Sequence, residues 1–296
     1  DRNFPGTSYT GMVKPVAGLS VKGVLFHHGY NNALEDARPK QYELNFKALV
    51  NDWRTTFNDN DLPFGIIELS AGGQPQTLEN FEARMVDAAP YIREGQFKAF
   101  QEIANTGFIP IHDQQVNWYH PQKKVVAGER TARWALSTLY GFDLDWEPVL
   151  VAAVDRLKDK IIVTFNNEVK PSDDRAIEGF SIAGSDGRFY PAKAKYLETQ
   201  EEGERPVYDK KRIEVWNSQC LDPIEVRYAW ARNPLGNLVN PRSRIPVALF
   251  RTDNWDYPEA PYETDAYAAH RIRMRTLRQE AKDLAALRIK AEGNKE

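Results

Sequence analysis

The order of strand-like and helix-like segments constrains the fold of this chain more than any other feature of its sequence. Between residues 1 and 142, short apolar runs at 21–26, 62–69 and 108–111 alternate with segments of helical periodicity. One such segment has apolar side chains at helical spacing (Tyr42, Phe46, Leu49, Val50 and Trp53). Strands that alternate with helices predict a mostly parallel sheet. We therefore expect residues 1–142 to form an α/β unit.

The last helix of this unit has recognisable ends, and a histidine stands just before it. It should run from about Pro121 to Tyr140, because proline suits the first helical position and Gly141 suits the position after the last. His120 lies at the junction with the preceding polar loop. A histidine held there can act as the general base for a hydrolytic nucleophile. The sequence contains no G-x-S-x-G or Gly-Asp-Ser motif to supply that nucleophile, and Cys220 lies in no recognisable motif.

The second part of the chain, residues 143–257, changes character. Short runs of strand-forming residues are separated by turn clusters such as Ser185-Asp186-Gly187. Strands at this spacing predict an antiparallel β-sandwich or jelly roll. The expected strands lie at 161–165, 179–183, 211–216 and 224–230.

The third part, residues 258–296, is dominated by one amphipathic helix that begins near residue 263. Its expected apolar side consists of Ala268, Ile272, Leu277, Ala281, Leu284 and Leu287. A membrane-surface or calmodulin-binding helix is the alternative, but acidic residues dilute its positive charge (Glu280, Asp283 and Glu292). We therefore expect this helix to pack on its own protein or on a neighbouring subunit.

Composition narrows the classes of function. The chain has 296 residues, enough for one large domain or two modest ones, and a net charge of −3, which argues against a general nucleic-acid binder. It has no apolar run near the roughly 20 residues that cross a bilayer. Its single cysteine excludes an intrachain disulfide. The first residue is Asp1, with no initiator Met or signal peptide, so we expect it to be a cut end within a longer precursor, through processing or trimming.

Several stretches, in order over about 245 residues, resemble the sialate O-acetylesterase family of SGNH-type carbohydrate esterases. Each stretch alone is weak, and their order makes the resemblance specific. The α/β part contributes Gly29-x-x-Asn32-Ala33, Arg93-Glu94-x-Gln96, His120-Pro121-x-x-Lys124 and Gly128-x-Arg130. The β-rich part contributes the block from Gly179 to Phe189, Val226-Arg227-Tyr228-Ala229-Trp230, Gly236-Asn237-Leu238 and Phe250-Arg251-Thr252-Asp253.

The resemblance implies a partial flavodoxin-like hydrolase core followed by a β-sandwich and the C-terminal helix. It implies a carboxylic ester hydrolase that removes acetyl groups from sugars, with a nucleophilic Ser that lies upstream of this chain. His120 would be the general base, and Gly29 and Asn32 would lie near the oxyanion hole. The nucleophile would come from an N-terminal segment or companion chain of the same precursor. The protein would be secreted, periplasmic or lumenal as in lysosomes, with an acetylated carbohydrate as substrate and no cofactor or metal.

The sequence departs from the family pattern at several places around this site. His28 and Tyr30 replace a Gln and a Glu beside the oxyanion block, and we expect both to face substrate. Relatives have an Asp two or three residues before the catalytic His, where this chain has Trp118 and Asn117. Asp113, or Asn117 as a neutral acceptor, could orient the imidazole instead, and Trp118 could stack on a sugar.

Other candidates have ordinary explanations beside the functional ones. Glu68 stands where relatives end a strand in Gln, so its carboxylate could enter the site, although a strand-end carboxylate is more often solvated. Adjacent His27 and His28 suggest a metal site, but neighbours on a strand point to opposite faces, so we expect only one of them to face the pocket. The alternative function is a non-catalytic glycan-binding or structural module on a degenerate esterase scaffold, and a third is hydrolysis of a different polysaccharide ester.

Overall fold

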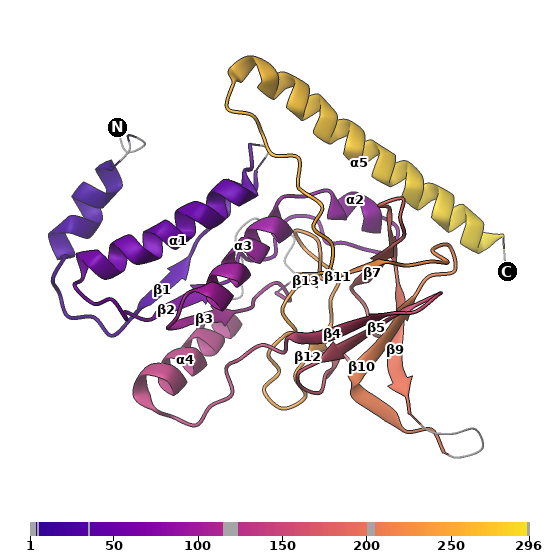
Figure 1. Cartoon of the computed structure of the whole chain (residues 1–296), viewed down its shortest axis with the longest axis horizontal. Helices are drawn as coiled ribbons and strands as arrows, with labels where there is room; N and C mark the ends of the chain where they lie inside the picture. Colours follow the sequence, from indigo (N-terminus) through magenta and orange to yellow (C-terminus); the bar gives the residue numbers. More distant parts are fainter. Residues whose placement is uncertain (1–3, 5, 35, 115–123, 200–204, 295–296) are drawn as a thin grey trace.

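The computed structural model describes residues 4, 6–34, 36–114, 124–199 and 205–294. An α/β layer with a three-stranded parallel sheet is followed by two antiparallel four-stranded sheets and a long C-terminal helix (Figure 1). This is the mixed α/β class expected from the order of strand and helix signals. The boundaries placed at residues 142 and 257 stay predictions.

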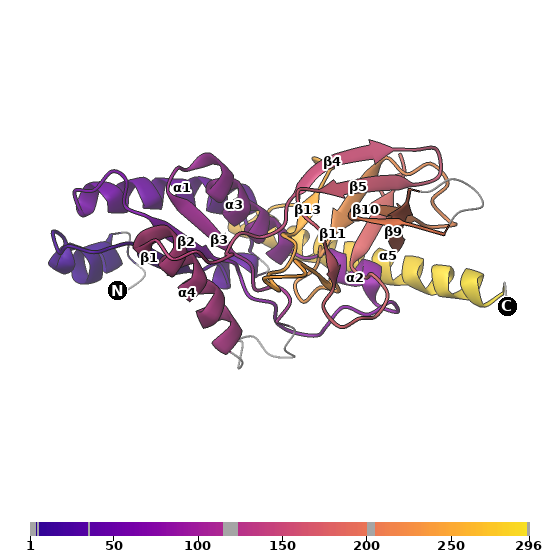
Figure 2. The same cartoon turned by 90° about the horizontal axis from the view of Figure 1, so that it is seen from below.

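The parallel sheet has the strand order β1-β2-β3, and helices cover both of its faces. In Figure 2, α1 and α3 lie on one side of the sheet and α4 lies on the other. The strands are β1 (Val24–His27), β2 (Phe64–Ile67) and β3 (Thr106–Ile109). The helices are α1 (Pro39–Thr56), α2 (Phe81–Met85), α3 (Ala89–Glu102) and α4 (Val125–Tyr140), with short helical turns η1 (Tyr9–Val13), η2 (Lys14–Val16) and η3 (Asn31–Ala33).

Close packing explains why the two covering layers fit this sheet. Tyr42, Phe46 and Val50 of α1 are buried, at the spacing expected from the sequence. On the other face, Trp134 of α4 lies directly on the backbone of β2 and β3. A Cβ atom added at Gly107 would come within 2.1 Å of the Trp134 ring, so the glycine is what lets the helix approach the sheet.

The ends of α4 match the expectation in part. The helix ends at Tyr140, and Gly141 adopts the left-handed conformation with φ of 74° that closes many helices. Its described start is Val125, and the expected first residue, Pro121, lies outside the described residues.

The β-rich part consists of two antiparallel sheets whose inner faces share a core. One sheet has the order β4-β5-β10-β9 and the other β13-β11-β7-β8, while β12 pairs with β6. Phe165 of the first sheet meets Phe250 of the second with ring centroids 6.4 Å apart. The strands are β4 (Val151–Arg156), β5 (Ile161–Phe165), β6 (Lys170–Pro171), β7 (Phe180–Ala183), β8 (Phe189–Pro191), β9 (Lys193–Glu198), β10 (Tyr208–Trp216), β11 (Glu225–Tyr228), β12 (Leu238–Val239) and β13 (Phe250–Arg251).

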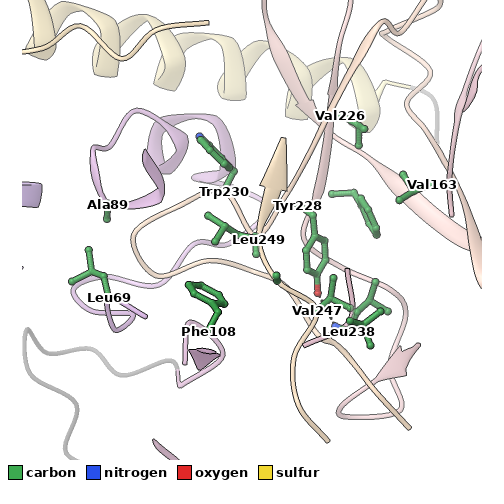
Figure 3. Close-up of a cluster of buried hydrophobic side chains, with 14 of the residues drawn as sticks. Leu69, Ala89, Phe108, Val163, Val226, Tyr228, Trp230, Leu238, Val247 and Leu249 are labelled. Carbon is green, nitrogen blue, oxygen red and sulfur yellow. Dashed lines mark hydrogen bonds between the residues drawn. The ribbon is translucent and has the colours of Figure 1, made fainter. Parts of the chain in front are cut away.

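The hydrophobic core is continuous between the two parts of the chain. Figure 3 shows Leu69, Ala89 and Phe108 of the α/β part approaching Trp230 and Leu249, behind which Tyr228 and Val226 continue into the sandwich. All of these side chains are buried in one cluster. Because the core is shared, the sandwich packs directly against the α/β part and is not a separate domain connected only by a linker.

Helix α5 (Thr264–Gly293) lies across the outside of the molecule and packs on α2 (Figure 1). The sequence-based choice of its apolar side was wrong in part, because Ile272 is 64% exposed and Leu287 is 66% exposed. The buried residues are instead His270, Met274, Ala285 and Arg288. Arg288 could join this face because it forms a buried ion pair of 2.8 Å with Glu82 of α2, which neutralises both charges. No described helix is long and apolar enough to span a bilayer.

Candidate functional site

The carboxyl ends of the three parallel strands carry the polar residues that the sequence singled out. His28 and Gly29 follow β1, Glu68 follows β2, and the segment 111–113 follows β3. Because parallel strands end at one edge of a sheet, these residues gather there, where ligands of open α/β sheets usually bind.

Gln96 of α3 ties the ends of β1 and β2 together. Its side-chain amide donates to the His28 carbonyl at 2.9 Å, and its oxygen accepts from the Leu69 N–H at 2.8 Å. The same amide nitrogen lies 3.1 Å from the hydroxyl of Tyr42. Gln96 is fully buried, so these bonds form where water does not compete. The backbone of the Gly29 loop is thereby held in one place.

Gly29 occupies a position that only glycine fits comfortably. Its φ is 119°, and an added Cβ would approach the Ile92 side chain to 3.0 Å. The chain then turns into η3, which holds Asn32 half-buried. The Gly29 turn and the short helical turn together give a compact block that carries backbone N–H groups and the Asn32 amide, the kinds of donor from which oxyanion holes are built.

A cavity of about 410 Å³ adjoins this block. His28, Asn31 and Asn32 line it, together with residues of α1 that include Tyr42. The His28 ring stacks on the Tyr42 ring, with centroids 6.0 Å apart. Burial lowers the pKa of His28, so its imidazole is neutral at pH 7 and can both donate and accept. Of the two adjacent histidines, His28 is the one that faces this cavity.

His27 faces a different partner, a serine that the sequence did not single out. Its Nε2 atom lies 3.1 Å from the hydroxyl of Ser70. Burial, and then the positive charge of Lys124, lower the pKa of His27, which leaves the ring neutral. Ser70 is 9% exposed, so most of this residue is covered by its neighbours.

Glu68 is not the solvated strand-end carboxylate that is usual at such a position, because it is completely buried. It accepts backbone N–H groups of Ile111 at 2.7 Å and of His112 at 2.9 Å. The Nδ1 atom of His112 also lies 2.9 Å from it. These donors satisfy the charge from the protein interior, so Glu68 fixes the start of the segment that follows β3 instead of meeting solvent.

The charge of Glu68 is stabilised despite its burial. Burial alone would raise its pKa, but the neighbouring His112 and the Arg93 guanidinium, whose Nε lies 3.9 Å away, hold the pKa below its ordinary value. Nε2 of His112 is buried and has no hydrogen-bond partner within the described part of the chain. Glu68 therefore remains an anion inside the protein.

Asp113 is engaged by an arginine of α4. Both of its oxygens accept from Arg130, at 2.6 and 2.7 Å, and Arg130 also donates to the Pro110 carbonyl. Burial alone would raise the pKa of Asp113, but this bidentate pair lowers it below the ordinary value of 3.8. The pair joins the end of β3 to α4, and His120 lies between these two residues in the sequence.

We expect Asp113→Asn to lower the free energy of unfolding at pH 7 by about 1.5–3 kcal/mol, the usual worth of hydrogen bonds to a charged group. The lowered folded pKa means that the carboxylate stabilises the fold above pH 3.8 and loses this effect as the pH falls through the folded value. Urea unfolding of both proteins should therefore converge at acidic pH. Asp145→Asn, which breaks the exposed pair with Arg242, is the control and should cost less than about 1 kcal/mol.

The remaining site residues of the sequence prediction divide into two groups. His120, Asn117 and Trp118 lie outside the described residues. Tyr30 is half-buried, packs against the main hydrophobic core and precedes η3. The structure thus places His28 and Asn32 on the wall of one cavity, with the buried Gly29 next to His28 behind that wall.

Sequence reasoning missed the buried residues whose hydrogen bonds fix the carboxyl edge of the parallel sheet. Arg93 and Gln96 belonged to a family-like stretch, yet neither was proposed for the site. A stronger signal was available, because two long polar side chains three residues apart stand on the side of a helix that also carries Ile92 and Ala99. Polar residues on an otherwise buried face indicate partners in the interior.

Comparisons with known proteins show what the chain is similar to. Residues 4–118 match the family model described as "Carbohydrate esterase, sialic acid-specific acetylesterase". The chain is 22% identical to human sialate O-acetylesterase over 269 residues, which cover 82% of this chain and 48% of that protein. It is 24% identical to the mouse protein of the same name over 249 residues, covering 76% and 42% respectively. The chain spans about half the length of the curated relatives it matches.

A solved structure is also similar. It is a carbohydrate acetylesterase from Xanthomonas citri, which superposes with a TM-score of 0.70 at 30% sequence identity. The match covers 83% of this chain and 54% of the other. The similarity therefore extends through both the parallel sheet and the β-rich part, since neither alone makes up that share of the chain.

Proposed function

Because this chain belongs to the sialate O-acetylesterase family of carbohydrate esterases, we propose that it supplies the histidine-bearing part of a carbohydrate O-acetylesterase. In the proposed reaction, a Ser from an N-terminal segment or companion chain attacks the acetyl carbonyl. His120 takes the proton of that Ser and later gives it to the departing sugar hydroxyl. Water then repeats the attack on the acetyl-enzyme and releases acetate.

The arrangement of the Gly29 block carries the proposal. The left-handed turn at Gly29 and the half-buried Asn32 place donors at the carboxyl edge of the sheet, where negative charge develops on the acetyl oxygen. Gln96 holds this block against the end of β2, so the donors do not need to reorganise during the reaction. Preorganised donors of this kind stabilise a tetrahedral intermediate more than its ester.

Further roles follow for the other residues at this edge. His28, neutral and exposed to the 410 Å³ cavity, is proposed to hydrogen-bond sugar hydroxyls, with Tyr30 and Trp118 as further substrate contacts. Asp113 and Asn117 are the candidates to orient His120. Arg130 already binds both Asp113 oxygens, so Asp113 would orient the ring with the lone pairs that remain. Glu68 is proposed to act indirectly, because its hydrogen bonds fix the backbone of residues 111 and 112 at the carboxyl edge of the sheet.

The open edge of the parallel sheet supports a second segment or chain. Among the described residues, β1 hydrogen-bonds with β2 alone, so one side of β1 has no partner strand. Leu25 of β1 is 55% exposed although it faces the same side as the buried Trp134. A strand and a helix packed there would complete the sheet and bury this side chain. We propose that the segment carrying the nucleophile does so, in a secreted or lumenal protein.

The proposal is tested by assaying the complete protein and the 296-residue chain side by side on p-nitrophenyl acetate and on acetylated sugars. Only the protein that includes the nucleophile segment should turn over ester. Ser70→Ala in the complete protein should keep the wild-type rate within about twofold, because the proposed nucleophile is a Ser of another segment and Ser70 is largely buried. An active isolated chain that Ser70→Ala silences would overturn the proposal, and an inactive complete protein that binds sugars would favour the glycan-binding module.

A further inference from the structure

A groove of about 600 Å³ runs beneath α5, between that helix, α2 and the start of β8. It shares no lining residue with the 410 Å³ cavity beside His28 and Asn32. Between the two, Arg232 pairs with Asp87 at 3.0 Å and donates to the Ala33 carbonyl. A groove of this size, at the junction of separate elements, is in the range that binds small molecules.

Aromatic rings form one wall of the groove. Tyr91 and Tyr257 lie 5.3 Å apart between ring centroids, and Phe189 continues the wall. The guanidinium of Arg227 lies 4.1 Å from the Phe189 ring centroid and is held in place by Asp253. Sugar rings have apolar C–H faces that pack on such aromatic surfaces, while their hydroxyl groups need polar partners around the edge.

Two polar groups at the same groove have hydrogen-bonding capacity that the described residues do not use. Glu82 lines it and is 3% exposed, with Oε1 bound to Arg288 and with Oε2 buried and unpartnered among the described residues. The hydroxyl of Tyr257 has no hydrogen bond within the described residues either, and burial raises the pKa of this group. A buried carboxylate oxygen without a donor is costly, and a ligand hydroxyl would satisfy it after a small shift of the side chain.

The charge of the groove selects between kinds of sugar. Three of its charged residues are already neutralised by partners outside the groove, namely Glu82, Asp87 and Arg227. Glu280 and Asp283 remain against Arg188, and Arg278 adds a second positive charge beside Val86 and Tyr257 of the groove wall, so the groove carries no excess charge. A groove without excess positive charge gives a carboxylated sugar no counter-charge, whereas a neutral sugar needs none.

We propose that this groove beneath α5 is a second carbohydrate-binding site that holds a neutral sugar residue of a polysaccharide. The inference rests on the proposed carbohydrate function and deepens it. Arg232 joins the groove wall to the end of the Gly29–Ala33 block, because it binds both Asp87 and the Ala33 carbonyl. Binding at a remote site raises the local concentration of acetyl esters at the reactive one.

The test is calorimetric titration with unacetylated cellohexaose, xylohexaose and mannohexaose, and with oligomers of N-acetylneuraminic acid. Ala281→Trp fills the groove from α5, while Ala286→Trp places the same side chain on the exposed side of the same helix. The neutral sugars should bind the wild type and the Ala286→Trp protein equally. Binding to Ala281→Trp should be at least about tenfold weaker. Tyr257→Phe keeps the ring and should weaken binding by removing one hydroxyl.

Three results would overturn this inference: no binding of any neutral oligosaccharide, unchanged binding in both Ala281→Trp and Tyr257→Phe, or tighter binding of the acidic sugar. If Ala281→Trp does not fold, Tyr257→Phe alone decides, since its aromatic packing is unchanged. The oligosaccharides carry no ester, so these outcomes are independent of acetylesterase activity. Loss of esterase activity with intact sugar binding would count against the proposed reaction only.

Discussion

Replacing His120 with alanine in the complete protein should lower kcat/KM for p-nitrophenyl acetate by about 10²–10⁴-fold. Without a base, the nucleophilic Ser must lose its proton to water in the same step in which it attacks the acetyl carbonyl. The oxyanion donors and the binding cavity would remain, so some turnover above the uncatalysed rate should persist. The measurement is steady-state turnover at pH 7 with wild type and variant at equal concentration.

A general base can be told apart from a structural histidine by chemical rescue. Added imidazole should restore part of the His120→Ala rate, and the wild-type rate should rise with pH through the range near 6.5 in which histidine loses its proton. A variant that merely unfolds gains nothing from imidazole. Equal rates for wild type and His120→Ala would remove His120 from the mechanism and, with it, the esterase proposal in its present form.

Arg93→Met should be the most destabilising of the substitutions proposed for this chain, with a loss of about 3–5 kcal/mol in the free energy of unfolding. Arg93 is fully buried and donates to the carbonyls of Leu69, Ala231 and Arg232 at 2.7–2.8 Å. Methionine fills similar space but leaves three buried acceptors without donors. Glu68, 3.9 Å from the guanidinium, would also lose its compensating cation.

Denaturant unfolding measures this loss of free energy. Two further variants separate the effect of the charge and of the forked hydrogen bonds from that of removing any arginine. Arg93→Lys keeps the charge but cannot make the forked set of bonds, so it should also destabilise the protein. Arg242→Met removes an arginine that is 86% exposed and should change the free energy of unfolding by less than about 0.5 kcal/mol. Arg93 of α3 binds carbonyls of residues 231 and 232 and so joins the α/β part to the β-rich part. A small effect of Arg93→Met would mean that these carbonyls find water or other donors and that this connection contributes little to stability.

Much of the fold could be predicted because it depends on local patterns. The expected strand at 161–165 coincides with β5, and Gly141 ends α4 as expected, since periodicity and a left-handed glycine are properties of a few neighbouring residues. The buried side of α5 could not be found in this way. Arg288 is buried only because Glu82, about two hundred residues earlier, supplies its counter-charge.

The candidate site was predictable to the same extent. Gly29 and Asn32 could be singled out by resemblance to a family, and in the structure Asn32 lines one cavity with His28. Glu68 could not be placed correctly, because a strand-end carboxylate is normally solvated and only the folded chain brings the N–H groups of residues 111 and 112 onto it. Partners that are distant in sequence decide whether a charged residue faces water.

The unpartnered side of β1 has a consequence for anyone who handles this polypeptide by itself. Among the described residues no strand pairs with the outer side of β1, and such an edge next to exposed Leu25 is a template on which another copy can add its own strand. At high concentration the isolated chain should therefore form dimers or insoluble aggregates through that strand. Solubility on co-expression with the proposed nucleophile-bearing segment would then report the completion of the sheet before any enzymatic assay is run.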